Sequence, residues 1–165
     1  MFTWNQGDSD MIERTISTPI GDLRLVGTAD ALCEVHLTPG VQGGCDARPS
    51  RALDETERQL AEYFGGERTQ FDLPLDLAGT EFQREVWAAL QTVEFGQTCS
   101  YLDIARKLGR DASSCRAIGQ ANGKNPVPVI VPCHRVIAAD RTLGGYSGGL
   151  DLKRRLLAHE GVHAV

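Results

Sequence analysis

A cysteine and a histidine stand side by side at Cys133 and His134, after an apolar segment with proline at positions 126, 128 and 132. Such an approach would hold the sulfur rigidly, and a neighbouring imidazole could withdraw its proton, since the thiolate and not the thiol is the nucleophile. A free cysteine is more often a small buried hydrophobe. The pair permits a nucleophilic thiol, and the surrounding residues must decide between the two roles.

A carboxylate near the C-terminus could complete this site. Asp151 is predicted to cap a final helix in which Leu152, Leu156 and Glu160 fall on one stripe. A buried Glu160 would orient His134, which would take the proton of the thiol directly or through one water. An exposed position near the helix end is the ordinary place for a glutamate. The residues alone therefore leave this role open.

The elements that would position these groups are predicted from capping and turn residues. Two capping boxes, Thr80 with Gln83 and Ser100 with Asp103, open successive helices. Residues 109–111 form a turn before a third helix, which starts near Ala112 and carries Ser113, Ser114 and Arg116 on its early turns. A helix-turn-helix over residues 100–122 normally places its second helix in a DNA groove. Simple packing is an equally common use of a short helical hairpin.

The N-terminal half is predicted to form a small sheet with one helix. Strands are expected over residues 12–18, 22–26 and 32–37, the last alternating Cys33, Val35 and Leu37 with polar residues. Ser50 can cap a helix that ends at Gly65-Gly66 and has Leu53, Leu60, Ala61 and Phe64 on one face. Residues 72–79 are predicted to be an extended connector between two domains.

Several short motifs occur in one order along the C-terminal half. They are RAIGQAN at 116–122, NP at 125–126, PCHRV at 132–136, GYSGGL at 145–150, Lys153, LL at 156–157 and EG at 160–161. This set resembles the O6-alkylguanine-DNA alkyltransferase family, also called methylated-DNA–protein-cysteine methyltransferases, densely from Thr80 to Gly161. Residues 17–21 with Leu23 and Leu25 resemble the family's opening hairpin more loosely, and residues 38–49 match no motif.

The resemblance implies an α+β protein of two domains. Residues 1–77 would form a small three-stranded antiparallel sheet with a helix, similar to ribonuclease H, and residues 78–165 a mainly helical winged helix-turn-helix domain. The implied function is direct-reversal DNA repair, in which the alkyl group of O6-alkylguanine, with O4-alkylthymine as a further candidate, moves once onto Cys133. Alternatives are a non-catalytic alkyltransferase-like lesion-binding protein, which would carry tryptophan at the cysteine position, and a winged-helix transcription regulator.

Family roles are implied residue by residue. The catalytic set would be Cys133, His134, Glu160, Tyr101 and Asn125, with Asn125 bracing the turn before the active-site segment. Arg116 would fill the gap left by a flipped nucleotide, and Tyr101 would crowd its phosphate and donate toward guanine N3. The DNA-binding set comprises Arg116, Ser113, Ser114, Ala117, Gly119, Tyr101 and Arg135. The substrate pocket comprises Val136, Tyr146, Ser147 and Gly148.

Two positions depart from the family pattern. Cys115 stands where alanine is usual, and a second thiol there could be alkylated or oxidised if exposed. Arg141 stands where glycine commonly makes the turn before the pocket loop. The zinc-ligand positions of some animal members fall on Thr28 and Cys33, which with His36 do not make a four-ligand site, so neither a metal nor another cofactor is expected.

Charge divides the chain. Residues 1–83 carry 6 basic and 15 acidic residues, whereas residues 84–165 carry 11 and 7, within an overall charge of −5. The basic half, with Arg106, Lys107, Arg110, Arg116, Lys124 and Arg135, could meet the phosphates of a DNA duplex, although a solvated face would also suffice. No apolar run predicts a membrane span or signal peptide. With five cysteines in no paired spacing, we expect a cytoplasmic monomer whose partner is alkylated double-stranded DNA.

Overall fold

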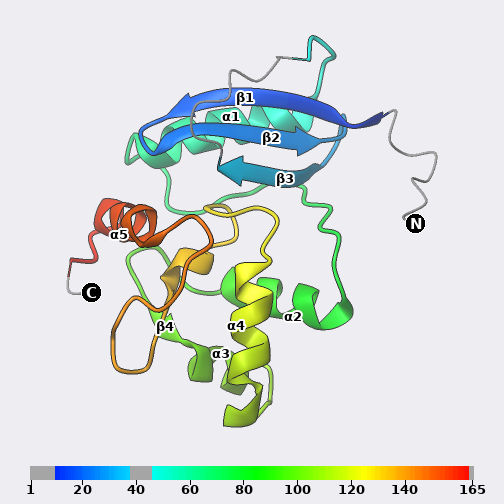
Figure 1. The fold of residues 1–165 in the computed structure, drawn as a ribbon. Coiled ribbons are helices and arrows are strands. Elements are labelled where there is room, and N and C mark those ends of the chain that lie inside the picture. Colours follow the sequence, from blue (N-terminus) through cyan, green and yellow to red (C-terminus); the bar gives the residue numbers. More distant parts are fainter. Residues whose placement is uncertain (1–9, 38–45, 164–165) are drawn as a thin grey trace. The chain divides into compact units, whose positions relative to one another are not determined.

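A computed structural model describes residues 10–37 and 46–163, so Cys45 and most of the 38–49 loop lie outside the described residues. The chain divides into two compact units, residues 1–78 and 79–165. Figure 1 shows a sheet with one helix in the first unit and a group of helices in the second. The predicted α+β class is confirmed.

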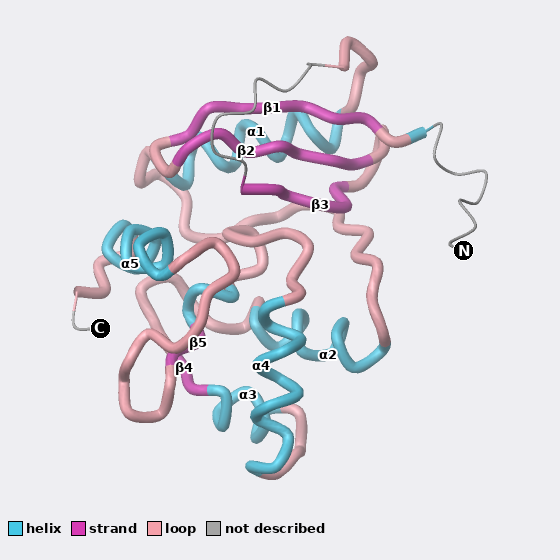
Figure 2. Tube along the Cα trace, in the orientation of Figure 1, coloured by secondary structure: helices cyan, strands magenta, loops and turns pink. Residues whose placement is uncertain are grey.

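The first unit is built on a three-stranded antiparallel sheet. Strands β1 (Ile12–Thr18), β2 (Gly21–Gly27) and β3 (Leu32–Leu37) follow in the order β1-β2-β3. Helix α1 (Arg51–Phe64) lies along one face of this sheet (Figure 2), where it contacts all three strands. The core is formed by apolar side chains on both layers, among them Leu23, Leu25, Val35, Leu53 and Leu60.

Helix α1 begins as predicted but turns a different face inward. The Ser50 hydroxyl accepts from the Leu53 backbone N–H at 3.1 Å and donates to the Thr28 carbonyl at 2.7 Å, which ties the helix start to the β2–β3 turn. Ala61, which was expected on the buried face, is exposed, and Phe64 is half-buried. Tyr63 is fully buried instead, because it follows Leu60 by three residues on the stripe that begins at Leu53.

The connector over residues 72–79 is extended, as expected, but its first half is part of the sheet unit. The Leu32 N–H donates to the Pro74 carbonyl and the Asp76 N–H to the Leu32 carbonyl, each at 2.9 Å. These two bonds make a short parallel bridge between Leu32 and Leu75. Leu32 is buried for this reason, in addition to the alternating residues of β3.

The second unit is mainly helical. Its elements are α2 (Glu81–Leu90), β4 (Cys99–Ser100), α3 (Tyr101–Lys107), α4 (Cys115–Gly123), β5 (Val136–Ile137) and α5 (Leu150–His159), with 3-10 turns at Ala112–Ser114 and Cys133–Arg135. Both predicted capping boxes are present, at Thr80 and at Ser100. Helix α4 packs on α2 and α3, and the buried Trp87 indole donates to the Ala121 carbonyl at 2.9 Å. The last turn of α4 is thereby fixed to α2.

The helix-turn-helix runs through α3 and α4. Gly109, at φ +66, makes the left-handed turn after α3, a conformation that glycine adopts without strain. The Asp111 carboxylate then accepts from the Ser113 N–H at 2.9 Å. The stretch from Ala112 to Ser114 is a 3-10 turn, so the α-helix itself begins three residues later than predicted, at Cys115.

Helix α5 starts differently from the prediction. Gly149, at φ +90, occupies the N-cap position, and Asp151 is an exposed first-turn residue paired with Arg154 at 3.2 Å rather than a cap. The inner face of α5 carries Leu157, which packs with Ile137 of β5 and Leu143 of the preceding loop. The loop over residues 138–149, called the pocket loop from here on, is thus anchored in the core on both sides of its exposed tip.

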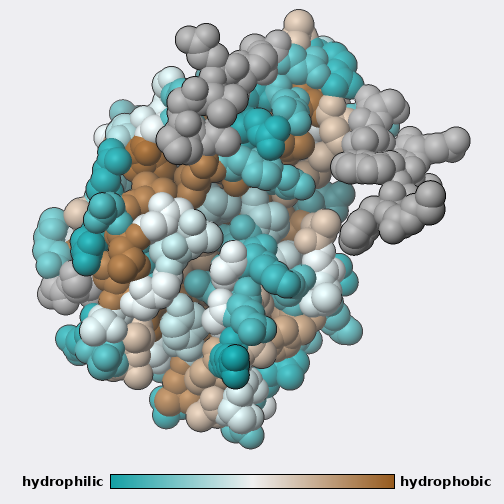
Figure 3. All heavy atoms as spheres, viewed as in Figure 1, coloured by the Kyte–Doolittle hydropathy of each residue, from teal (hydrophilic) through white to brown (hydrophobic). Residues whose placement is uncertain are grey.

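Hydrophilic side chains are interspersed with smaller hydrophobic areas on the face drawn in Figure 3. Within the described residues, no helix is long and apolar enough to cross a membrane.

Candidate active site

The parallel pairing of β4 with β5 brings two distant segments together. Cys99 pairs with Val136 and Ser100 with Ile137. Tyr101 follows β4 directly, and the Cys133–Arg135 turn directly precedes β5. The short sheet therefore places the start of helix α3 next to the cysteine turn, although the two lie some thirty residues apart in the chain.

Asn125 holds the segment that leads to the cysteine. Its side-chain oxygen accepts from the Val127 N–H at 3.0 Å, and its amide nitrogen donates to the Val131 carbonyl at 2.7 Å. Between these two points Val129 adopts φ +75, a strained conformation for a β-branched residue. The bracing role expected for Asn125 matches this geometry, because its two bonds close the strained turn on both sides.

Cys133 is buried, with 2% of the residue exposed. Burial raises the pKa of this thiol above its ordinary value of 9.0, while hydrogen bonds from the side chains of Asn125 and Tyr146 and the charge of Lys153 act in the opposite direction. The resting group is therefore a thiol at neutral pH. Two donors and one cation already surround it, and they stabilise the thiolate once the proton leaves.

His134 is fully buried, and its Nε2 lies 2.7 Å from Glu160 Oε1. Because the carboxylate accepts, Nε2 carries the proton and the lone pair lies on Nδ1. Among the described residues Nδ1 has no hydrogen-bond partner. Burial lowers the pKa of His134 below 6.5 against the opposing effect of Glu160, so the ring is neutral at pH 7. The residue that follows the thiol is therefore a neutral imidazole with a free lone pair on Nδ1, which is the form a general base requires.

Glu160 is buried and saturated with donors. Arg135 donates to it through Nε at 2.8 Å and Nη2 at 3.0 Å, and the Gly96 N–H donates at 3.3 Å. The exposed alternative considered for this glutamate is wrong. Arg135, predicted in the DNA-binding set, is buried in the structure, and its guanidinium donates to Glu160 and to the Val93 carbonyl, the latter at 2.5 Å. Its observed contacts fix Glu160, which in turn orients His134.

Tyr101 is the first residue of helix α3, and its side chain lies close to helix α4 and to the pocket loop. A Cβ at Gly119 of α4 would lie 3.6 Å from its ring, and one at Gly144 would lie 3.7 Å from its hydroxyl. Burial, followed by the nearby sulfurs, raises the pKa of Tyr101. Tyr146 is half-buried, and Ser147 and Gly148 are exposed at the loop tip. Tyr101 therefore keeps its proton at neutral pH and remains a hydrogen-bond donor.

Lys153 was part of the motif set but received no site role from the sequence. It is fully buried, and its Nζ donates to the carbonyls of Val136 at 2.6 Å and Leu143 at 2.5 Å. Val136 belongs to the predicted substrate pocket, and its carbonyl, which accepts this bond, retains one lone pair. The signal that could have identified Lys153 is its position, three residues before the buried Leu156, on the inner stripe of α5.

Most of the predicted DNA-binding residues lie on the 3-10 turn Ala112–Ser114 and on helix α4. Arg116, Ser113 and Ala117 are exposed, and Ser114 and Gly119 are partly buried. No ion pair involves Arg116 within the described part of the chain. Cys115 is half-buried beside it. An unpaired guanidinium on an exposed helix start is free to contact a nucleic acid.

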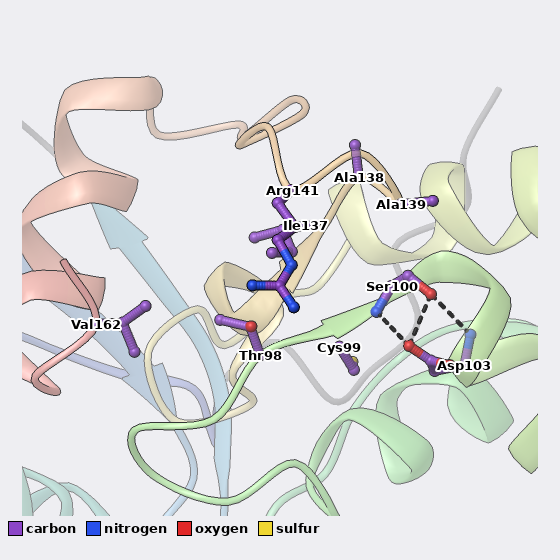
Figure 4. A pocket seen from close by; sticks show the side chains of 9 residues that line it. All are labelled: Thr98, Cys99, Ser100, Asp103, Ile137, Ala138, Ala139, Arg141 and Val162. Carbon is purple, nitrogen blue, oxygen red and sulfur yellow. Dashed lines mark hydrogen bonds between the residues drawn. The ribbon is translucent and has the colours of Figure 1, made fainter. Parts of the chain in front are cut away.

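A separate cavity of about 410 Å³ lies beside β4 and β5. Figure 4 shows the side chain of Arg141 reaching among its lining residues, which include Thr98, Cys99 and Asp103. Arg141 adopts φ +66. The turn geometry that suits glycine is therefore kept with arginine in its place, at a cost in backbone strain of about 1 kcal/mol. Cys133 does not line this cavity.

Family models match both units. Residues 11–77 match the ribonuclease-like domain and residues 81–162 the DNA-binding domain of 6-O-methylguanine DNA methyltransferase. The two models define a class of protein, a ribonuclease-like domain joined to a DNA-binding domain. The chain belongs to the 6-O-methylguanine DNA methyltransferase family.

Individual relatives are similar over nearly the full length. The methylated-DNA–protein-cysteine methyltransferase of Mycolicibacterium paratuberculosis is 47% identical, over 93% of this chain and 95% of that protein. The constitutive enzyme of that name from Bacillus subtilis is 40% identical, over 81% and 85%. The crystal structure of Mycobacterium tuberculosis OGT in complex with DNA superposes with a TM-score of 0.80 at 46% identity, covering 90% of this chain and 91% of that one.

Proposed function

We propose that this protein repairs DNA by direct reversal, moving the alkyl group of O6-alkylguanine onto the sulfur of Cys133. Relatives at 47% and 44% identity are named for the methyl transfer to cysteine, and a similar structure contains DNA. The thioether formed is not reversed, so each molecule acts once. Residues 1–77 would form the supporting domain and residues 78–165 the DNA-binding and catalytic domain.

One observation carries this proposal: a buried thiol, Cys133, next to a neutral His134 whose tautomer is fixed by Glu160. His134 Nδ1 takes the thiol proton, directly or through one water, and the thiolate attacks the alkyl carbon. The S–C bond forms as the C–O6 bond breaks, and the electron pair of that bond remains on the guanine. The guanine ring then gains a proton in exchange, through solvent, for the one that His134 took from the thiol, so that the repaired guanine and the imidazole are both neutral.

Tyr101 and the pocket loop would bind the guanine, which is the leaving group of the alkyl transfer. The Tyr101 hydroxyl, which keeps its proton, donates toward guanine N3 as negative charge develops there. Ser147 and Gly148 would supply hydrogen bonds near O6, with Tyr146 as a wall. The remaining lone pair of the Val136 carbonyl would accept from the exocyclic amine. These donors stabilise the base as it departs, which lowers the barrier to transfer.

The target nucleotide must rotate out of the DNA duplex to reach the sulfur of Cys133, because that residue is only 2% exposed. Arg116, together with Ser113, Ser114, Ala117 and Gly119 at the start of α4, would meet the DNA, and Arg116 would occupy the gap in the base stack. The surface on which these residues lie is exposed and free of ion pairs to Arg116 in the described residues. Double-stranded DNA is thus the proposed partner.

The non-catalytic alternative is disfavoured, because Cys133 stands where lesion-binding proteins would carry tryptophan. A transcription regulator would need helix α4 but leaves the buried Cys133, His134 and Glu160 without a role. The four cysteines in the described residues are free. A reducing compartment such as the cytoplasm would keep the nucleophile reduced. We further propose that the protein acts as a monomer and that O4-alkylthymine is a second substrate.

The direct test is to mix the protein with a duplex containing one O6-methylguanine and to analyse both products by mass spectrometry. The expected result is a single methyl group on the peptide containing Cys133 and an unmodified guanine in the DNA. Binding without transfer would support the lesion-binding alternative, and equal binding to undamaged DNA would support a regulator.

A further inference from the structure

Lys153 is fully buried, and its three hydrogen-bond partners are backbone carbonyls. Its Nζ donates to the carbonyls of Val136 at 2.6 Å, Leu143 at 2.5 Å and Gly145 at 3.3 Å. An ammonium has three N–H donors and no lone pair, which matches three carbonyls. A neutral amine has two donors and would turn its lone pair toward the third carbonyl. The geometry therefore selects the charged form.

The three carbonyls belong to the two sides of the proposed pocket. Val136 directly follows the Cys133–Arg135 turn, whereas Leu143 and Gly145 lie in the loop that leads to Tyr146. The Tyr146 ring centroid is 6.0 Å from Nζ, and the Tyr146 side chain acts to lower the pKa of the Cys133 thiol against the larger effect of burial. One ammonium thus joins the turn that carries the nucleophile to the loop that contacts it.

Few ionisable groups face this ammonium. Among the described residues they are Cys133 and His134 from the cysteine turn and Tyr146 from the pocket loop. Glu160, at the end of the helix that carries Lys153, is bound to His134 and Arg135. Asp140 and Arg141, on the pocket loop, are exposed. Burial lowers the pKa of Lys153 to about 8, with a partly compensating effect of Cys133. The ammonium is thus present at neutral pH and is lost as the pH rises through about 8.

We propose that Lys153 is a positioning residue for alkyl transfer, whose ammonium fixes the pocket loop against the Cys133 turn and stabilises the thiolate formed there. This inference rests on the proposed function. Alkyl transfer would then require, besides Cys133 and His134, a buried positive charge that holds the cysteine turn and the pocket loop together. The transfer step itself is unchanged, because Lys153 neither gains nor loses a proton in it.

A distinctive pH dependence follows. A reaction limited only by thiol ionisation speeds up as the pH rises toward the thiol pKa. Proton transfer from the thiol to neutral His134 keeps the rate level near neutrality. If the ammonium is also required, the rate falls as the pH rises through about 8, because Lys153 loses its charge while the Cys133 thiol, whose pKa is raised above 9.0, is still protonated. The direction of the change above pH 8 therefore separates the two cases.

The first experiment measures the single-turnover rate of methyl transfer from an O6-methylguanine duplex between about pH 6.5 and 9.5, a range of roughly three units that spans the titration of Lys153. Wild type should decline above pH 8. Lys153→Met should be slower by about tenfold at pH 7 and should rise with pH. Lys153→Arg keeps the charge but places its donors in a planar fork, so it should be slow without a decline above pH 8. Arg154→Met, which removes an exposed charge from the same helix, should follow wild type.

The second experiment needs no DNA. Iodoacetamide labelling of Cys133 between about pH 7 and 11, followed by peptide mass spectrometry, gives the apparent pKa of the thiol, which is raised above 9.0. Lys153→Met should raise it by about one unit or more, the effect of removing an opposite charge a few ångströms away. If Lys153→Met fails to fold, the wild-type transfer profile decides alone, and a rate that rises through pH 8–9 overturns the proposal.

The two experiments separate failure of this inference from failure of the proposed function. Wild type that transfers no alkyl group, together with a raised thiol pKa in Lys153→Met, refutes the repair function and supports the electrostatic role of Lys153. Normal transfer in wild type and in Lys153→Met, with the same thiol pKa, refutes the role of Lys153 and leaves the repair function supported.

Discussion

Cys133 and Cys99 lie in the same unit, and burial is the main cause that raises the pKa of each thiol, yet their neighbours differ. Cys99 faces the Asp103 carboxylate, which adds to the effect of burial against a smaller opposing effect of Lys107, and its pKa reaches about 11. Cys133 is more deeply buried but has two hydrogen-bond donors and an ammonium around it. Burial alone makes a thiol inert. Donors, a cation and an adjacent base distinguish the proposed nucleophile.

The largest expected effect comes from replacing the sulfur of Cys133 by oxygen, with the same replacement at Cys99 as the control. Cys133→Ser should abolish alkyl transfer while leaving binding to the lesion largely intact, because the pocket and helix α4 remain. Cys99→Ser should transfer at the wild-type rate. Labelled methyl groups would be mapped by peptide mass spectrometry. Uptake of label by Cys133→Ser, or a wild-type adduct on Cys99 or Cys115, would contradict the assignment of the nucleophile.

The second test removes the group that fixes the base. Glu160→Gln leaves Arg135 as a buried cation without its carboxylate, which should destabilise the protein by about 3–5 kcal/mol. The variant also allows the wrong tautomer of His134, so transfer should slow by about 10²–10⁴-fold. Urea unfolding and single-turnover rates measure the two effects. The exposed Glu94→Gln is the matched control, and a Glu160→Gln variant with wild-type rates would show that His134 does not act as the base.

The third test concerns access to the sulfur rather than its chemistry. Arg116 should compensate unstacking of the base, which costs a few kcal/mol. Arg116→Ala should therefore slow repair of duplex DNA far more than reaction with free O6-benzylguanine, which needs no flipping. The two rates are compared in one preparation. Equal slowing of both reactions would place Arg116 in the pocket or the fold.

The sequence predicts the local elements of both units well, because their signals are local. The capping boxes at Thr80 and Ser100 and the cap at Ser50 are present in the structure, since each depends on residues three positions apart. Asp151 was a reasonable cap by type, but Gly149 ends the pocket loop two residues earlier and takes that position. Which face of α1 is buried depends on the sheet it packs against, and Ala61 was misplaced for that reason.

The proposed site shows a second limit of sequence reasoning. Cys133 and His134 are adjacent in the chain, so their pairing is visible in the sequence. Arg135 follows them in the same motif, and as a basic residue in the basic half of the chain it is predicted to contact a DNA phosphate. Its binding to Glu160 and Val93 depends on how α5 and the end of α2 meet the cysteine turn. Partners of buried charges come from tertiary packing, which residue types do not specify.

The fourth prediction concerns the room around the two sulfurs. A methyl group on Cys133 enters a packed site, which should cost about 1–3 kcal/mol, and the alkylated sulfur loses its interactions with Asn125 and Tyr146. The melting temperature should fall by several degrees, and a benzyl group should lower it further and weaken DNA binding through the Asn125 turn. Cys99 lines a cavity of about 410 Å³, so a methyl group there should have a smaller effect. Unchanged melting of both Cys133 adducts would mean that the pocket has spare room.

The smallest expected effect is the pH dependence of stability caused by the base beside Cys133, which Cys99 lacks. Burial lowers the pKa of folded His134 below 6.5, so the unfolded chain takes up a proton there before the folded protein does. The free energy of unfolding should therefore fall as the pH drops below 6.5, by at most about 1.4 kcal/mol per pH unit for one proton. Carboxylates with lowered pKa values, such as Asp103, add their own loss only near pH 4 and below. Urea unfolding of wild type and His134→Asn between about pH 7 and 5 isolates the histidine. A slope that persists unchanged in His134→Asn would show that folding does not lower the pKa of His134, which would contradict the buried neutral imidazole assigned as the base.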